Sequence, residues 1–305
     1  MLWFKRKKSL PGWLAIALDS KAIRYVHAEV TAGSRPRVFA YAEAPFSAGA
    51  TISDAVGEFD FSPYQCTTLL EAGEYQMLMV ESVANLAPEE LKSAMRWKVK
   101  DMVDFPVEQA TVDVVPIPGV PGRTPQAWVV AARNEVIGER MSRLDGAGVP
   151  LLAIDVVETA QRNVAALFEE DGRGVGYLYF DEAGGLFTVT QGGELFLTRR
   201  LDITSKQMLE RPADQRGDLF DRITLELQRT LDNFERQAAN VIVSRLVLGP
   251  EPEDSGLADF LRNSLSLPVV QGALSDVIEF PGGEPSAHDQ WRYMNLIGCA
   301  MRTAA

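Results

Sequence analysis

Residues Gly174–Ile203 read GVGYLYFDEAGGLFTVTQGGELFLTRRLDI, a stretch in which aromatic and β-branched residues gather into three short runs. Glycine pairs separate these runs, and glycine supplies the positive φ that tight turns between strands require. The stretch therefore predicts three consecutive antiparallel strands. The predicted strands are Tyr177–Phe180, Leu186–Thr190 and Glu194–Ile203, with turns at Gly184-Gly185 and Gly192-Gly193.

The same layout occurs near the N-terminus. Trp13–Leu18, Ala22–Val30 and Arg37–Ala42 form three more strand-like runs, with a turn after the first and Gly33-Ser34 after the second. Strands and helices alternate through the rest of the chain in units too mixed for a simple parallel sheet. Because two similar units indicate an internal repeat, we expect two related α/β halves.

The composition is that of an ordinary globular protein. The chain has 305 residues, 46% of them hydrophobic and 24% charged, which suffices for a large core divided among subdomains. A formal net charge of −12 argues against nucleic-acid binding, because only the first eight residues offer a basic surface. Cys66 and Cys299 are far apart in the sequence, so we expect buried free thiols in a reducing compartment.

The first residues combine aromatic side chains with four consecutive cations. We expect no signal peptide, since the apolar run Trp13–Leu18 is short and ends at Asp19, and no stretch is long enough to span a bilayer. The segment is either a frayed soluble tail or a weak anchor on an anionic membrane, where each cation contributes about 1 kcal/mol. The candidate membrane contacts are Trp3, Phe4, Lys5, Arg6, Lys7 and Lys8.

A clear helical pattern begins at Pro88 and ends before Pro106. Proline fits the first helical turn, and Leu91, Met95, Val99 and Met102 form the predicted core stripe. Trp97 lies outside this stripe, among polar residues that include Asp101. A tryptophan on such a face is either covered by another subdomain or available to a partner.

Motifs for several kinds of chemistry are absent. The sequence contains no Gly-x-x-x-x-Gly-Lys-[Ser/Thr], Gly-x-Gly-x-x-Gly or Gly-x-Ser-x-Gly. Its two histidines, His27 and His288, have no cysteine or carboxylate at ligand spacing, so we expect no metal site. The carboxylates are scattered and form no evident acid/base pair.

The order of these elements, together with several short motifs, resembles the actin-like type IV pilus assembly proteins of the PilM type. It looks particularly similar to their MshI-like relatives in mannose-sensitive haemagglutinin (MSHA) pilus systems. The resemblance covers nearly the whole chain. The matching residues are Met95–Pro106, Thr111–Val114, Val130–Ala132, Asp155, Thr198-Arg199, Gly249 and Ile297–Arg302.

The resemblance implies an α/β actin-like fold, as in FtsA and PilM, with two ribonuclease-H-like halves and a small inserted α/β subdomain. Residues 1–80, 134–172 and 289–305 would form the first half. Residues 81–133 would form the inserted subdomain and residues 173–288 the second half.

This chain departs from the nucleotide site of actin-like ATPases. That site carries one Asp-x-Gly turn in each half, but here the two aspartate positions hold Ala17 and Tyr179. Asp19 and Asp181 stand at the glycine positions, where they bring negative charge towards a phosphate. The adenosine-side glycine pair is replaced by Gly249-Pro250. The vestigial site would comprise Ser20, Lys21, Gly184, Gly185 and Gly249.

We therefore expect a non-catalytic cytoplasmic scaffold of an MSHA-like type IV pilus, without metal or nucleotide cofactor. Its expected partner is the cytoplasmic tail of a PilN-like bitopic inner-membrane protein. This chain would bind that tail at the inner-membrane surface, either as a monomer or as a homo-oligomer. In the resembled family a groove beside the inserted subdomain binds this tail, which implies roles for Trp97 and Asp101. The alternative function is a slow ATPase or ATP-gated switch in the same machinery.

Overall fold

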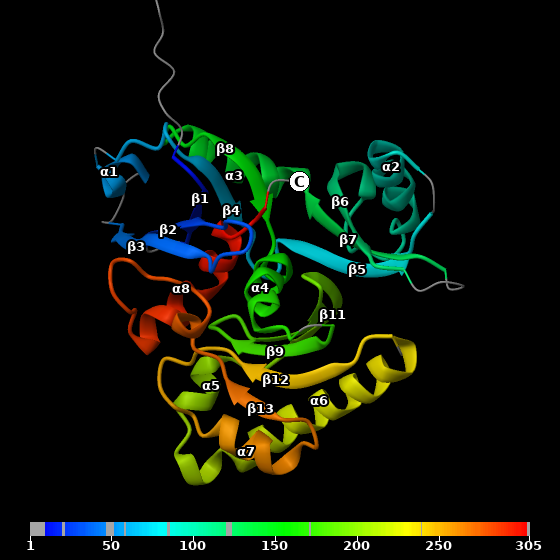
Figure 1. Cartoon of the computed structure of the whole chain (residues 1–305). Coiled ribbons are helices and arrows are strands. Elements are labelled where there is room, and N and C mark those ends of the chain that lie inside the picture. The colour runs from blue at the N-terminus through cyan, green and yellow to red at the C-terminus, as the bar shows by residue number, and fades with distance from the viewer. Residues whose placement is uncertain are drawn as a thin grey trace, which may run out of the picture.

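The computed structural model describes residues 10–19, 22–46, 52–57, 59–83, 86–119, 124–170, 172–238 and 240–303. Three sheets and their covering helices make up this part of the chain (Figure 1). The candidate membrane contacts from Trp3 to Lys8 lie outside the described residues, as do Ser20 and Lys21.

The first sheet contains the N-terminal set of predicted strands. Its strands are β1 (Trp13–Leu18), β2 (Ala22–Glu29), β3 (Arg37–Pro45), β4 (Gln65–Leu69) and β8 (Leu151–Asp155). They lie in the order β3-β2-β1-β4-β8, with β1, β2 and β3 antiparallel and with β4 and β8 added as parallel strands. The central strand β1 is apolar on both faces because helices or core residues cover both sides of it.

The second sheet repeats this plan. Its strands are β9 (Gly174–Phe180), β10 (Gly185–Gln191), β11 (Glu194–Leu201), β12 (Val243–Leu248) and β13 (Val269–Gln271). The order β11-β10-β9-β12-β13 matches that of the first sheet, with the same three antiparallel and two parallel additions. The two predicted sets of strands and the expected repeat of two related α/β halves are therefore confirmed.

A third, smaller sheet carries the inserted subdomain. Its strands are β5 (Tyr75–Glu81), β6 (Ala110–Ile117) and β7 (Gln126–Arg133), in the order β5-β7-β6, and α2 (Pro88–Lys98) packs on one face. We had expected the insertion to begin at residue 81. The structure places all of β5 in the inserted sheet, because β7 pairs with β5 along its whole length from Tyr75 onward.

Two helices fill the space between the large sheets. These are α4 (Val157–Ala165) and α8 (Ala287–Ala300), which pack on each other and on both sheets (Figure 1). One apolar cluster runs from Ala15 and Val26 through these helices to Tyr177 and Val247. The two halves therefore share a continuous core.

The remaining helices cover the outer faces. The longest, α6 (Gly217–Gln237), packs with α7 on the second sheet. No helix in the described ranges is long and apolar enough to cross a membrane. The other helices are α1 (Ile52–Val56), α3 (Asn134–Asp145), α5 (Ser205–Leu209) and α7 (Leu257–Ser264), with 3-10 turns at Val107–Gln109, Ala166–Phe168, Ala213–Gln215 and Leu274–Asp276.

Candidate functional site

The turns after β1 and β9 occupy equivalent places in the two halves, and each begins with an aspartate. Asp19 Oδ1 accepts a hydrogen bond from the Ala22 N–H at 2.9 Å. Asp181 Oδ1 accepts from the N–H groups of Ala183 at 2.8 Å and Gly184 at 3.0 Å. Asp19 thus takes one backbone donor and Asp181 takes two, of the kind that an anion-binding turn would direct at a phosphate.

Tyr179 occupies the second expected aspartate position and joins β9 to α8. Its side chain is buried, and its hydroxyl donates to the carbonyl oxygen of Trp291 at 2.6 Å. The Trp291 indole N–H donates in return to the Phe180 carbonyl oxygen at 2.8 Å. Burial raises the pKa of Tyr179 well above its usual value, so the phenol stays neutral at physiological pH.

Asp181 also contacts α8. Its second carboxylate oxygen accepts from the Asn295 side-chain amide on α8 at 3.0 Å. Burial raises the pKa of Asp181, although the N–H donors of Ala183 and Gly184 oppose this change. The carboxylate therefore acts as a local hydrogen-bond acceptor that joins the β9–β10 turn to α8.

The three expected nucleotide-site glycines pack against the protein itself. A Cβ on Gly249 would lie 2.9 Å from the Tyr177 hydroxyl oxygen, and the Gly249 N–H already donates to the Leu178 carbonyl oxygen. A Cβ on Gly185 would lie 2.4 Å from the Phe180 ring, and Gly184 has a φ of +149°. These glycines permit close approach of neighbouring chain segments, and the space beside Gly249 is filled by aromatic rings.

The described residues at this place offer few groups to a magnesium nucleotide. Ala17 and Tyr179 offer no carboxylate to a metal, and the donors of the β9–β10 turn are bonded to Asp181. Within the described ranges, no group of three histidine, cysteine, aspartate or glutamate side chains could hold a metal ion.

The inserted subdomain exposes five large apolar side chains, those of Met79, Val83, Leu86, Trp97 and Met102. The Trp97 side chain is 60% exposed, with the Lys100 ammonium 5.6 Å above its ring, so no other described subdomain covers it. The prediction that Met102 joins the core stripe is wrong. It is 50% exposed because α2 ends at Lys98, while Met95 and Val99 are buried as expected. Asp101 lies beside them and is exposed.

A buried polar network ties this subdomain to the second half. The Tyr75 hydroxyl on β5 bonds to the Glu158 carboxylate of α4, and Arg200 of β11 bonds to both groups at 2.7 Å. Nearby, the Trp128 indole N–H donates to the Leu195 carbonyl oxygen at 3.0 Å. Sequence reasoning missed this network because its members come from distant segments of the chain, which only the fold brings together.

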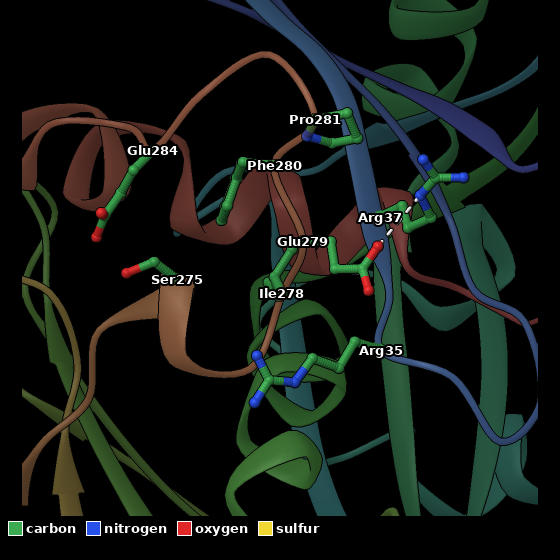
Figure 2. A pocket seen from close by; sticks show the side chains of 8 residues that line it. All are labelled: Arg35, Arg37, Ser275, Ile278, Glu279, Phe280, Pro281 and Glu284. Atoms are coloured by element: carbon green, nitrogen blue, oxygen red, sulfur yellow. Dashed lines mark ion pairs between the residues drawn. The ribbon is translucent and has the colours of Figure 1, made fainter.

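An open hollow of about 450 Å³ lies where the two halves meet at the outer edge of β3 (Figure 2). Glu279 pairs with β3 through backbone hydrogen bonds to Pro36 and Val38, and its carboxylate lies 3.3 Å from Arg37. Both cations and anions line its rim, so the hollow shows no single preferred ligand charge. The lining residues are Arg35, Arg37, Ser275, Ile278, Glu279, Phe280, Pro281 and Glu284.

Comparison with solved structures places the chain in the actin-like fold class. No family model and no curated protein sequence matches it. The type IV pilus biogenesis complex PilM-PilN matches with a TM-score of 0.70 and 19% identity, over 95% of this chain and 98% of the other.

Two weaker likenesses are the cytoplasmic domain of EpsL, an inner-membrane component of the Vibrio cholerae type II secretion system, and a Bacteroides thetaiotaomicron protein with an actin-like ATPase fold. The first has a TM-score of 0.47 and 13% identity, over 93% of this chain and 94% of the other. The second has a TM-score of 0.48 and 10% identity, over 98% of this chain and 99% of the other.

Proposed function

We propose that the protein is a non-catalytic scaffold of a type IV pilus assembly platform, of the MSHA kind, that binds the cytoplasmic tail of a PilN-like inner-membrane protein. The likeness to the PilM-PilN complex, which extends over 95% of the chain, is the observation that carries this proposal. The inserted subdomain and both halves are included in that likeness. The whole architecture, rather than one shared half, therefore supports a role of the same kind.

The geometry between the halves supports the non-catalytic part of the proposal. Asp19 and Asp181 bond to their own turns, and Tyr179 is bonded to Trp291 where a metal-binding carboxylate is expected in an ATPase of this fold. Catalysis of phosphoryl transfer depends on placing cations and donors around the phosphates. A neutral phenol and two carboxylates at the corresponding positions of this chain support a non-catalytic role.

The exposed apolar side chains of the inserted subdomain support the partner-binding part. An exposed tryptophan is typical of the central residue of a binding surface, where tryptophan is enriched. We infer that Trp97 anchors the partner tail and that Asp101 lies at the edge of the same contact.

Replacing Trp97 with alanine tests this assignment. Because an aromatic anchor typically contributes about 2 kcal/mol, Trp97→Ala should weaken binding of the tail by at least roughly thirtyfold. The measurement is isothermal titration with a synthetic peptide of the PilN-like tail from the same genome. The melting temperature should fall only slightly, since the Trp97 side chain is exposed.

A matched control is Leu225→Ala, which removes an exposed apolar side chain from α6 in the second half. This variant should bind the peptide as the wild type does. If Trp97→Ala binds normally, the partner contact lies elsewhere on the molecule. If the wild type binds no peptide, the scaffold proposal itself is wrong.

We further propose that residues Trp3–Lys8 hold the protein weakly at the cytoplasmic face of the inner membrane. Four cations beside two aromatic residues favour an anionic lipid surface. Deleting Met1–Lys8 should reduce sedimentation with phosphatidylglycerol-containing vesicles at low salt and leave the melting temperature unchanged. Undiminished sedimentation would show that this segment is not the anchor.

A further inference from the structure

The inserted sheet has an open edge along β5. β5 pairs with β7 on one side, and no described strand pairs with its other side. The Ser82 N–H donates to the Pro125 carbonyl oxygen at 2.7 Å, which fixes the alternation of the ladder. Residues 76, 78 and 80 therefore bond to β7, and the backbone groups of Met77 and Met79 point outward.

Residues 98–104 run beside this edge. The Lys98 ammonium donates to the Glu81 carbonyl oxygen at 2.6 Å, and the Asp104 N–H donates to the Gln76 side chain at 3.1 Å. These two bonds join the segment to opposite ends of β5. Met102 in this segment and Met79 in β5 both have exposed side chains, which flank the outward-facing backbone groups.

β5 is also held firmly at its first residue. The Tyr75 side chain is buried and bonds to Glu158, and Arg200 bonds to the Tyr75 hydroxyl. An edge that is fixed before binding loses little conformational entropy when a peptide adds to it. Most of the conformational entropy lost on binding is then lost by the peptide.

We propose that the partner tail binds as an added strand on the outer edge of β5, hydrogen-bonded to the backbone groups of Met77 and Met79. This inference rests on the scaffold function proposed above. Its occupant is an extended apolar peptide, whose alternate side chains lie beside the exposed Met79 and Met102. The free edge is short, since Tyr75 is buried at one end and Lys98 occupies the Glu81 carbonyl at the other, and so it suits a tail better than the sheet of a second copy.

A proline at position 79 separates the backbone contribution from the side chain. Met79→Pro removes one outward N–H and spares the bonds of Leu78 and Val80 to β7, and proline is tolerated where an edge strand's N–H faces outward. Compared with Met79→Ala, which loses only the side chain, Met79→Pro should bind the synthetic tail peptide about tenfold more weakly. Equal affinities of the two variants would overturn the proposal.

Two further measurements work on the wild-type protein and so do not depend on the folding of the proline variant. Hydrogen exchange should show the Met77 and Met79 amides becoming protected when the peptide binds. Single N-methylation along the peptide should weaken binding at every second residue, as strand pairing requires. Binding without protection or without this alternation refutes strand addition and leaves the scaffold function standing.

Two other results would also contradict strand addition by the partner tail. A wild-type protein that binds no peptide refutes both proposals. Concentration-dependent protection of the same amides without peptide would assign the edge to a second copy of the chain and overturn the proposal made here.

Discussion

Tyr177 and Tyr179 are two residues apart on β9 and point into the same core cluster between the halves. Both side chains are buried, yet their hydroxyls differ. The Tyr179 hydroxyl donates to the Trp291 carbonyl oxygen, whereas the buried Tyr177 hydroxyl has no hydrogen-bond partner among the described residues. The pair therefore offers a direct measure of what the Tyr179 bond contributes.

Removing each hydroxyl should have different effects. Tyr179→Phe loses the hydrogen bond between the hydroxyl and the Trp291 carbonyl oxygen, so the free energy of unfolding should fall by about 1 kcal/mol. Tyr177→Phe removes a hydroxyl that is buried without a partner and should be neutral or slightly stabilising. Urea unfolding of the two variants measures both values. Equal effects would show that the Tyr179 bond does not hold the halves together.

At this scale the sequence predicted the substitutions but not their consequences. Alignment with the resembled family puts Ala17 and Tyr179 at the expected metal positions. It could not show that Trp291, more than 100 residues away, bonds to Tyr179, because only the folded chain brings α8 beside β9. The aspartates of the turns could likewise be located from sequence, but their bonds to Ala22 and Gly184 could not.

The predicted elements agree best where the sequence pattern is local. Both sets of three antiparallel strands follow from their glycine turns and apolar runs. β5 was assigned to the wrong sheet because a strand's own residues do not specify its partner, and β7 comes 45 residues after the end of β5. The end of α2 was placed too late because Met102 continues the apolar spacing beyond the helix.

The crossing of α4 and α8 gives a physical reason for one motif in the resemblance. Gly298 lies where the two helices touch, and a Cβ there would be 2.1 Å from the Ala160 carbonyl oxygen. Any larger residue would force the helices apart. The glycine in Ile297–Arg302 is therefore required for the close packing that joins the two sheets.

For the whole molecule, the contacts between the halves favour a single closed arrangement. The halves are joined at several places. The contacts are a shared apolar core, the Tyr179–Trp291 hydrogen bonds and the pairing of Glu279 with β3. Moving the two halves apart would expose core residues and break these hydrogen bonds at the same time. A scaffold benefits from such rigidity, whereas a nucleotide-gated switch requires two arrangements of similar free energy.

Magnesium and ATP should therefore leave the protein unchanged. At millimolar concentrations they should cause no phosphate release above background and no rise in melting temperature, because a ligand stabilises only the state that binds it. A known actin-like ATPase assayed in parallel is the positive control. Turnover that survives Tyr179→Ala unaltered would point to a contaminating enzyme. A thermal shift or turnover abolished by Asp19→Asn or Asp181→Asn would instead show that the turn carboxylates serve a working nucleotide site, and the ATP-gated alternative would then replace the non-catalytic scaffold.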